Sequence, residues 1–486
     1  MSSISGVIAS LANLLNGNGA RRVINRYAPW GVIALAAFLR LWQLGYPSKL
    51  VFDETYYVKD AWSLWNTGSE KSWPQDFNSA FEAGQVSGFL AEPSFVVHPP
   101  LGKWLIGFGM WLFGAENPFS WRIATALIGI AAVGLFMLVA KLLFRSQPWA
   151  IAAGFLFAID GHAIVMARTA LLDSTLMFFV LLAFYFLLRD QQIRNIDQTI
   201  LFRPWLLGAG LALGAATAVK WSGLYFLATF GLYVVISEAI AQKASGKQNW
   251  IGSAIFKRGS ITFLHLVPTA AVIYLFSWAG WILGSTGYDR NTTDNWLSSL
   301  VEYHKAAYGF HVALAVPHSY ASNPLSWLFA IRPTSFFYEG LSFGQSGCLS
   351  QDGCSSAITA LGNPFIWWPA AAAIFFVTIW YFKTRERLAG LVLLGVVAGY
   401  LPWIFYMQRT TFQFYSIVFL PWMILALIFV ARHYVNGAAR PVRAQGIFYA
   451  YLLVAVAGSL FFLPIWIGTW TPYWYWHLHM WLPSWI

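Results

Sequence analysis

The chain has 486 residues, of which 58% are apolar and only 10% are charged. Because soluble domains carry about 25% charged residues, this composition excludes a water-soluble protein built around ordinary cores. The formal net charge of +11 does not indicate a nucleic-acid partner, since the basic residues recur in short loops between apolar runs instead of forming one stripe.

Eleven apolar segments are close to the roughly 20 residues that a membrane-spanning helix needs. They are residues 28–46, 121–143, 147–166, 172–189, 204–219, 221–238, 259–282, 364–382, 388–407, 413–431 and 446–468. The predicted fold class is therefore an all-α polytopic membrane protein, with a transmembrane domain over residues 28–486.

Basic residues predict the orientation of these spans. Alternate loops carry short clusters of Lys and Arg, the pattern of cytoplasmic loops. The clusters are Arg21, Arg22 and Arg26; Lys141 and Arg145; Arg189, Arg194 and Arg203; Lys243, Lys247, Lys257 and Arg258; Lys383, Arg385 and Arg387; Arg432, Arg440 and Arg443. This places residues 1–27 in the cytoplasm, and an odd number of spans places the C-terminus outside. No cleavable signal peptide is expected, and residues 4–15 form either an amphipathic surface helix or an unstructured tail.

Two segments on the outer side are too long to be simple connections. They are residues 47–120 and 283–363, and long loops in compact domains are usually functional. Within the first, residues 101–114 (LGKWLIGFGMWLFG) are apolar but too short to span, which predicts a helix lying in the membrane interface. The outer tail, residues 469–486, is rich in Trp and fits a headgroup-level aromatic belt.

The two cysteines, Cys348 and Cys354, lie close together in the second outer loop. Thiols that are close in sequence outside the cytoplasm favour a local disulfide, with two free thiols as the alternative. A metal site is not expected from two Cys without a nearby His.

An adjacent acidic pair, Asp53 and Glu54, follows the first span. Neighbouring side chains diverge on a helix or a strand, so the pair cannot flank a sugar as a glycosidase pair does. We expect at most one of them to act as a base while the other orients it or binds a hydroxyl. The alternative is an acidic pair that stabilises the N-terminus of the next helix.

Four cations from separate parts of the chain are predicted at one membrane depth on the outer side. They are Lys103, Arg122, Lys220 and Arg409. Donors at headgroup level suit a lipid-linked phosphate. His98 and two prolines precede Lys103 and place it at a helix N-terminus, although Lys103 could instead simply extend toward the headgroups.

Two further outer segments carry candidate contacts. Arg168 and Asp173 bracket the turn between the third and fourth spans, either as substrate contacts or as a structural ion pair. In the second outer loop, His318, Tyr320 and Trp327 belong to a stretch of aromatic and hydroxyl residues that suits sugar or peptide contacts. A plainly packed loop is the alternative for that stretch.

Together these motifs resemble the bacterial protein O-mannosyltransferase family. The resemblance rests on the acidic pair after the first span and on HPPLGKWLI, RTALLD, VKWSGL, PHSYASNPLSW, ALGNPFIWW, GYLPWIFYMQRTTFQFY and WLPSWI. It implies the GT-C membrane fold, with Asp53 as the base, Glu54 beside it and Arg122 as the arginine that opens the second span. Eukaryotic members carry an MIR domain in the second outer loop, for which 283–363 is too short.

The resemblance also implies partners and location. The donor would be a polyprenyl-phosphate-mannose lipid, and the acceptor an unfolded Ser/Thr-rich polypeptide that emerges from the secretion translocon at the plasma membrane. No cofactor is required by the residues, although an Asp/Glu pair near phosphates could recruit a divalent cation. A GT-C enzyme that transfers a lipid-linked sugar to a glycolipid is the main rival, and a transporter is a weaker one because the charges lie at the outer ends of the spans.

Overall fold

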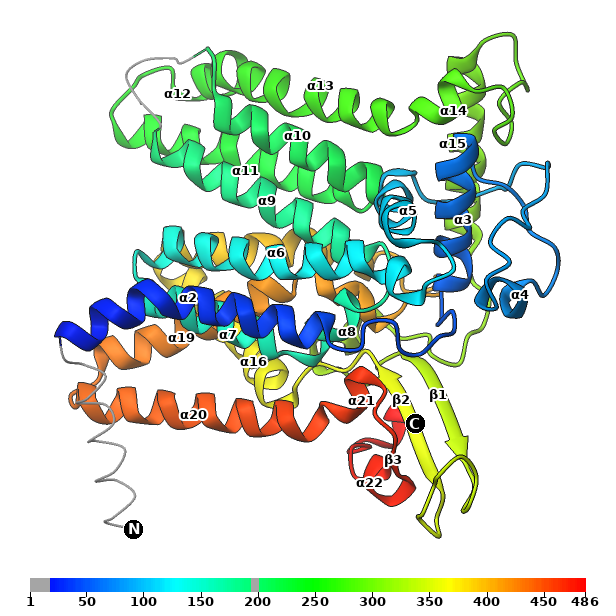
Figure 1. Ribbon diagram of the computed structural model, residues 1–486. Coiled ribbons are helices and arrows are strands. Elements are labelled where there is room, and N and C mark those ends of the chain that lie inside the picture. Colours follow the sequence, from blue (N-terminus) through cyan, green and yellow to red (C-terminus); the bar gives the residue numbers. More distant parts are fainter. Residues whose placement is uncertain (1–17, 194–200) are drawn as a thin grey trace.

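The computed structural model describes residues 18–193 and 201–486, so the predictions for residues 4–15 and for Arg194 lie outside the described part. Long helices run side by side across the molecule, and short helices, loops and a small sheet gather at one end of them (Figure 1). The chain is a multi-pass membrane protein. Six described helices are long and apolar enough to cross a bilayer, or seven if the bent pair α7–α8 forms one span.

Each of the eleven predicted ranges contains helix. In the first part of the chain these are α2 (Asn18–Leu41), α6 (Pro118–Phe144), α7 (Gln147–Ile159), α8 (Gly161–Ala167), α9 (Asp173–Gln192), α10 (Pro204–Val219), α11 (Gly223–Ala244) and α13 (Ser260–Ser277), the last preceded by α12 (Trp250–Gly252) and the π-helix η1 (Ser253–Gly259). In the second part they are α16 (Pro364–Thr384), α17 (Arg387–Gly399), α18 (Leu401–Ile404), η3 (Gln413–Val418), α19 (Leu420–Gly437), α20 (Pro441–Phe462) and α21 (Pro464–Ile467).

The two long connections hold the short elements. The first contains α3 (Glu54–Thr67), α4 (Asn78–Glu82) and α5 (Leu101–Phe113), and α5 is the short apolar helix expected at residues 101–114. The second follows α14 (Ala279–Leu283), which ends the predicted range 259–282, and contains α15 (Trp296–Ala313), η2 (Pro324–Phe329), β1 (Ser335–Leu341) and β2 (Cys354–Thr359). The tail contributes β3 (Thr471–Pro472), α22 (Tyr473–His477) and η4 (Pro483–Trp485).

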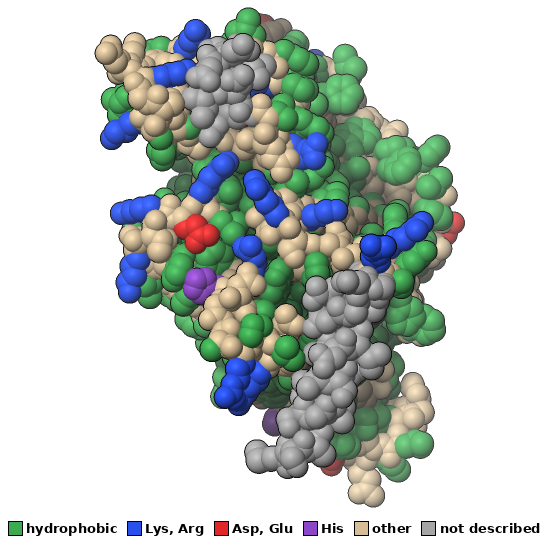
Figure 2. Space-filling model, turned by 90° about the vertical axis from the view of Figure 1, so that its left-hand side faces the viewer, with side chains coloured by type: hydrophobic (Ala, Val, Ile, Leu, Met, Phe, Trp, Pro, Cys, Tyr) green, Lys and Arg blue, Asp and Glu red, His purple; other side chains and the backbone are tan. Residues whose placement is uncertain are grey.

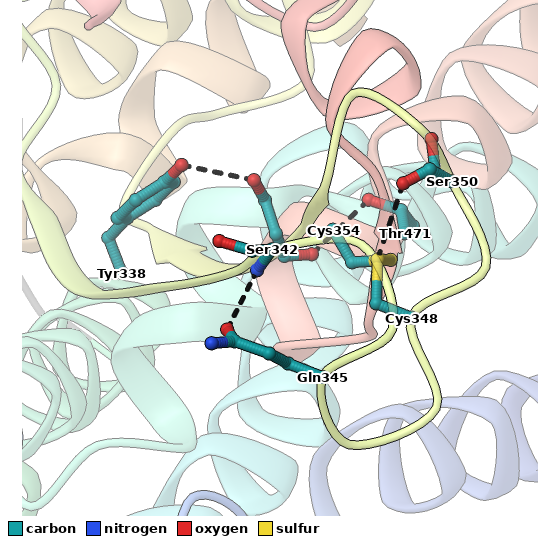
Figure 3. Close-up of a disulfide and its surroundings, with 8 residues drawn as sticks. Tyr338, Ser342, Gln345, Cys348, Ser350, Cys354 and Thr471 are labelled. Carbon is teal, nitrogen blue, oxygen red and sulfur yellow. Dashed lines mark hydrogen bonds between the residues drawn. A yellow bond between two sulfur atoms is a disulfide. The ribbon is translucent and has the colours of Figure 1, made fainter.

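The small sheet corrects the all-α prediction. Strands β1 and β2 pair antiparallel, with Leu341 opposite Cys354, and β3 pairs with the far side of β2. The predicted disulfide between Cys348 and Cys354 is formed and ties the hairpin loop to the first residue of β2 (Figure 3). The sheet escaped prediction because its third strand comes from the tail, more than 100 residues further along the chain.

Close helix packing depends on small residues. A Cβ atom added at Gly214 of α10 would lie 2.7 Å from the backbone of Ala270 in α13. At Gly395 of α17 an added Cβ would lie 1.9 Å from the buried indole of Trp422 in α19. Without a hydrophobic force between helices in lipid, such close approach supplies the van der Waals contact that holds them together.

A buried polar junction sets the bend between α7 and α8. Asp160 lies between the two helices and caps α8, its Oδ1 accepting the Ala163 N–H at 3.2 Å while Oδ2 accepts the Asn363 N–H at 3.0 Å. Asn363 in turn donates from its side chain to Ala455 O at 2.7 Å and to Ser459 Oγ at 2.8 Å. One fully buried junction therefore connects α8, α16 and α20.

The end of the bundle opposite the small sheet is basic. Figure 2 views the molecule from this end and shows Lys and Arg side chains gathered across the face. Lys141, Arg145 and Arg189 border a hollow there. The short predicted cytoplasmic clusters thus share one end of the molecule, and the two long connections lie at the other (Figure 1).

Replacing Asn363 by Ala should destabilise the protein by about 2–4 kcal/mol, because several buried hydrogen bonds lose their side-chain partner at once. Asn249→Ala is a matched control, since Asn249 caps α12 in an exposed position and its loss should cost about 1 kcal/mol or less. Thermal unfolding of both variants in the same detergent measures the difference. Equal losses of stability would contradict the assignment of Asn363 as a structural junction.

Candidate active site

Asp53 immediately precedes α3. The residue before it, Phe52, has a positive φ of 48°, which turns the chain into the helix. Asp53 is the N-cap residue but makes no side-chain capping bond. Its backbone carbonyl accepts from the Tyr56 and Tyr57 N–H groups at 3.0 Å, whereas its carboxylate forms no hydrogen bond or ion pair with any residue in the described ranges. Burial raises the pKa of Asp53 to about 6, while the charge of Lys220 lowers it and that of Asp173 raises it. The residue as a whole is half-buried.

The neighbouring Glu54 has the opposite character. Its side chain is fully buried, and its carboxylate is saturated by backbone and side-chain donors. The donors are the Val51 N–H at 3.0 Å, the Ala170 N–H at 2.8 Å, and Arg122 Nε and Nη2, each at 2.8 Å. Glu54 therefore fixes the start of α3, and with it the position of Asp53, without facing a substrate.

The guanidinium of Arg122 donates all its hydrogen bonds to groups inside the protein. Besides its two bonds to Glu54, it donates to the carbonyl oxygens of Leu44, Pro47 and Lys49 at 2.9–3.3 Å. Only 1% of its surface is exposed. The geometry does not support the prediction that Arg122 binds the lipid phosphate. Its bidentate pair with Glu54 joins α6 to the first residue of α3, and its carbonyl contacts hold the segment before α3.

A cavity of about 310 Å³ is lined in part by Lys220 and Asp173, the two residues whose charges act on Asp53. It is formed by the start of α9, the turn between α10 and α11, α15, the α17–α18 junction and the segment before η3. Its polar lining comes from His98, Asp173, Lys220, Trp221, Ser222, Tyr225, Tyr308, His311, Tyr406, Arg409 and Tyr415. The volume is within the range of small-molecule sites.

Two cations face this cavity in different electrostatic settings. Lys220 donates to Asp173 Oδ2 at 2.7 Å and lies 5.0 Å from the centre of the Tyr415 ring. Arg409 forms no ion pair with a carboxylate in the described ranges, and its buried Nε has no hydrogen-bond partner. Arg409 therefore leaves a positive charge in the cavity that an anion could neutralise.

The histidines in the cavity are neutral. Burial lowers the pKa of His311 to about 4, and burial together with the charge of Lys220 lowers that of His98 well below its usual range. His311 contacts Val97 O through Nε2 at 2.9 Å and Arg409 Nη2 through Nδ1 at 3.1 Å. A neutral ring that donates from Nε2 and accepts at Nδ1 satisfies both contacts and orients the guanidinium.

The chain is similar to known proteins over most of its length. Residues 90–283 match the family model for dolichyl-phosphate-mannose-protein mannosyltransferase, and residues 296–485 match the C-terminal four-span region of protein O-mannosyltransferases. The polyprenol-phosphate-mannose–protein mannosyltransferase of Mycolicibacterium smegmatis is 32% identical, over 93% of this chain and 92% of its own length. The chain belongs to this family. It is a protein mannosyltransferase, a glycosyltransferase.

Other mannosyltransferases are also similar over almost the whole chain. The polyprenol-phosphate-mannose–protein mannosyltransferase of Corynebacterium glutamicum is 30% identical, over 94% of this chain and 93% of that protein. A chain of the S. cerevisiae protein O-mannosyltransferase Pmt1-Pmt2 complex bound to the sugar donor superimposes with a TM-score of 0.74 at 16% identity, covering 95% of this chain and 92% of that one. The fold is therefore shared along almost the whole mannosyltransferase chain.

Lys103 does not reach the cavity of the mannosyltransferase. Its Nζ contacts Glu70 Oε1 at 2.6 Å and donates to His98 O at 3.1 Å, and its side chain is 1% exposed. This corrects the prediction that Lys103 binds the lipid phosphate or extends to the headgroups. The burial of its charge is compensated by Glu70, and the contact fixes the backbone of His98.

The predicted ion pair between Arg168 and Asp173 is wrong. Asp173 pairs with Lys220 and lines the cavity. Arg168 donates to four carbonyl oxygens at the end of α2, those of Leu39, Arg40, Trp42 and Gln43. Arg168 therefore caps α2, whose final carbonyls have no helical partners, and it makes no substrate contact in this arrangement.

The three candidate contact residues of the second outer loop lie in different surroundings. Trp327 is fully buried and donates to Ser322, so it packs the loop and is not an acceptor contact. His318 is exposed and lies edge-on to Phe52, with ring centres 5.8 Å apart, which places it beside Asp53. Tyr320 is covered by the guanidinium of Arg332 at 5.0 Å. Of these three residues, His318 is the one in ring contact with the neighbour of Asp53, and its contact with an acceptor stays a prediction.

Several cavity residues were missed from the sequence. His311 lies on α15 without a recognisable motif, and only folding places it against Arg409. Tyr406 and Tyr415 flank Arg409 within a stretch that carries the family resemblance, so that stretch did contain a signal for them. In the described ranges no three His, Cys, Asp or Glu side chains lie close enough to hold a metal ion, and a cation bound together with the donor stays a prediction.

Arg122→Met should destabilise the protein by about 3–5 kcal/mol, because it leaves the Glu54 carboxylate buried without its cation. Lys305→Met is the matched control: it breaks an exposed pair with Glu302 and should cost at most about 1 kcal/mol. Both are measured by thermal unfolding in detergent. An Arg122→Met protein that keeps its stability but loses donor binding would restore Arg122 as a phosphate ligand.

Proposed function

We propose that this enzyme transfers mannose from polyprenyl-phosphate-mannose to Ser or Thr hydroxyls of polypeptides, with Asp53 as the general base. The observation that carries the proposal is the unpartnered Asp53 carboxylate, whose pKa is raised to about 6, next to a cavity with an uncompensated cation. A general base works best with a pKa near the operating pH.

The donor phosphate binds between Arg409 and Lys220. Arg409 supplies the charge that has no carboxylate partner, and Lys220 exchanges part of its contact with Asp173 for the phosphate. Neutral His98 and His311 line the same cavity without adding charge, and Tyr406 and Tyr415 provide aromatic walls. Preorganised cations at the position where charge develops lower the barrier more than they would in water.

The reaction is a single displacement. The acceptor hydroxyl oxygen forms a bond to the anomeric carbon, its proton passes to Asp53, and the bond to phosphate breaks with its electron pair remaining on the phosphate. Because a phosphate monoester is a stable anion, no general acid is needed. The configuration at the anomeric carbon inverts, so a β-linked donor gives an α-linked product.

The membrane arrangement follows from the two ends of the bundle. The basic end faces the cytoplasm according to the positive-inside rule, and Asp53 with its cavity faces outward. The helices form a GT-C membrane domain of eleven crossings, in which shorter helices such as α10 and α17 complete spans with their flanking residues. An outward-facing site in the plasma membrane receives unfolded secreted polypeptide and donor lipid from the same leaflet.

Asp53→Asn should lower the turnover number by about 10²–10⁴-fold, because the amide cannot accept the hydroxyl proton. The measurement is transfer from purified polyprenyl-phosphate-mannose to a Ser/Thr peptide. The melting temperature should be unchanged or higher, since the ionised carboxylate is desolvated and unpaired in the folded protein. Asp352→Asn, in the exposed hairpin loop, is the matched control and should retain activity. Normal transfer by Asp53→Asn would overturn the assignment.

The pH profile should report the same carboxylate. The base must be ionised, so kcat/KM should fall as pH drops through about 6 and should level off above it. The donor phosphodiester stays ionised throughout this range and does not contribute. A midpoint near 4, the ordinary value for Asp, would show that the limiting group is not the desolvated Asp53.

A further inference from the structure

Strand β1 presents an unpaired outer edge. It pairs with β2 on one side only, and β1 is the terminal strand of the three-stranded sheet. Apart from the ladder to β2, none of the backbone groups of residues 335–341 bonds to backbone within the described ranges. In Figure 1 the strand forms the outer side of a hairpin that projects away from the helices. Free N–H and C=O groups of an edge strand are a template for another extended chain.

This edge begins beside the proposed base. The ring of Phe336, at the start of β1, lies 5.1 Å from that of Phe52, the residue directly before Asp53. His318 packs on the same Phe52 ring. The start of β1 is thus packed against the residue next to Asp53, so a chain paired along β1 would approach Asp53 at this end of the strand.

The strand is held rigidly in this position. One face is covered by the segment before Asp53, through the Tyr46–Phe337 ring contact and the Lys49–Glu339 ion pair at 3.3 Å. Ser356 of β2 donates to Gly468 O at 2.7 Å, which ties the sheet to the C-terminal tail. The disulfide fixes the loop of the hairpin (Figure 3). A preformed edge binds a flexible chain at a lower entropic cost.

We propose that the outer edge of β1 binds the acceptor polypeptide as an added strand and presents its Ser or Thr to Asp53. The proposal rests on the proposed function and extends it to how the acceptor is held. The acceptor of a protein mannosyltransferase is a polypeptide, and main-chain pairing suits such a partner because every residue offers the same backbone groups. The half-exposed Tyr338 and the exposed Gly340 leave room for acceptor side chains beside the strand.

Strand addition predicts a period of two along the acceptor. In an added strand only alternate residues direct their N–H groups toward β1. A set of peptides carries one Thr and, at one flanking position at a time, an N-methylated amide. The KM for the peptide should rise about fivefold to tenfold at every second position on the flank that covers β1, with kcat within twofold. A second set, in which an ester replaces the amide, removes the donor without adding a methyl group and should give the same alternation.

A flat profile, or a loss at every position alike, would overturn strand addition. The result is separable from the identity of the base. If Asp53→Asn remains active but the alternation persists, the role of Asp53 is wrong and the strand proposal stands. If Asp53→Asn is inactive as expected and the wild-type profile is flat, the reverse holds.

Cross-linking tests the contact without turnover. The chain has two cysteines and both are in the disulfide, so Tyr338→Cys introduces the only free thiol. In the Asp53→Asn background it should cross-link to a peptide that carries a thiol-reactive group on its flank, and unlabelled peptide should compete. Leu349→Cys, an exposed site in the hairpin loop away from the β1 edge, is the matched control and should react at the background rate. Equal labelling of both variants, or a disulfide joining two Tyr338→Cys copies in place of the peptide adduct, would overturn the proposal.

Discussion

The buried pair between Glu54 and Arg122 is the constraint on which the site depends. It joins the first residue of α3 to the start of α6, and the same guanidinium gathers three carbonyl oxygens of the segment that follows α2. Two charges in a buried position are tolerable only because each is fully hydrogen-bonded. Their effect is to hold Asp53 at a fixed place while leaving its own carboxylate without a partner.

The other cations at this end of the bundle fall into two groups, according to whether protein groups compensate their charge. Lys103 and Arg168 are buried against Glu70 and against the end of α2, so they build the scaffold. Lys220 is shared between Asp173 and the cavity, and Arg409 keeps a donor without an acceptor. A cation that the fold has not compensated is the one with interaction energy left for a substrate.

Three surfaces lie around Asp53 at the end of the bundle that carries the two long connections. The cavity with Arg409 suits the donor phosphate, the exposed His318 lies against Phe52, and the edge of β1 starts at the same phenylalanine. A bisubstrate enzyme needs its donor and acceptor to approach one base from different directions. The first long connection supplies the proposed base, and the second supplies both His311 in the cavity and the strand.

The sequence by itself determined the class of protein and the broad position of the site. Apolar runs, basic clusters and the acidic pair are local signals, because span length, loop charge and residue type depend on neighbours along the chain. They predicted helix in all eleven ranges, the short helix α5, the disulfide and the family. Only the tertiary structure decided which charges have partners within the protein: Arg122 pairs with Glu54 across 68 residues, Lys220 with Asp173 across 47, and His311 reaches Arg409 across 98. The physical reason is that the availability of a charge depends on its desolvation and its partners, and both are set by segments that meet only when the helices pack.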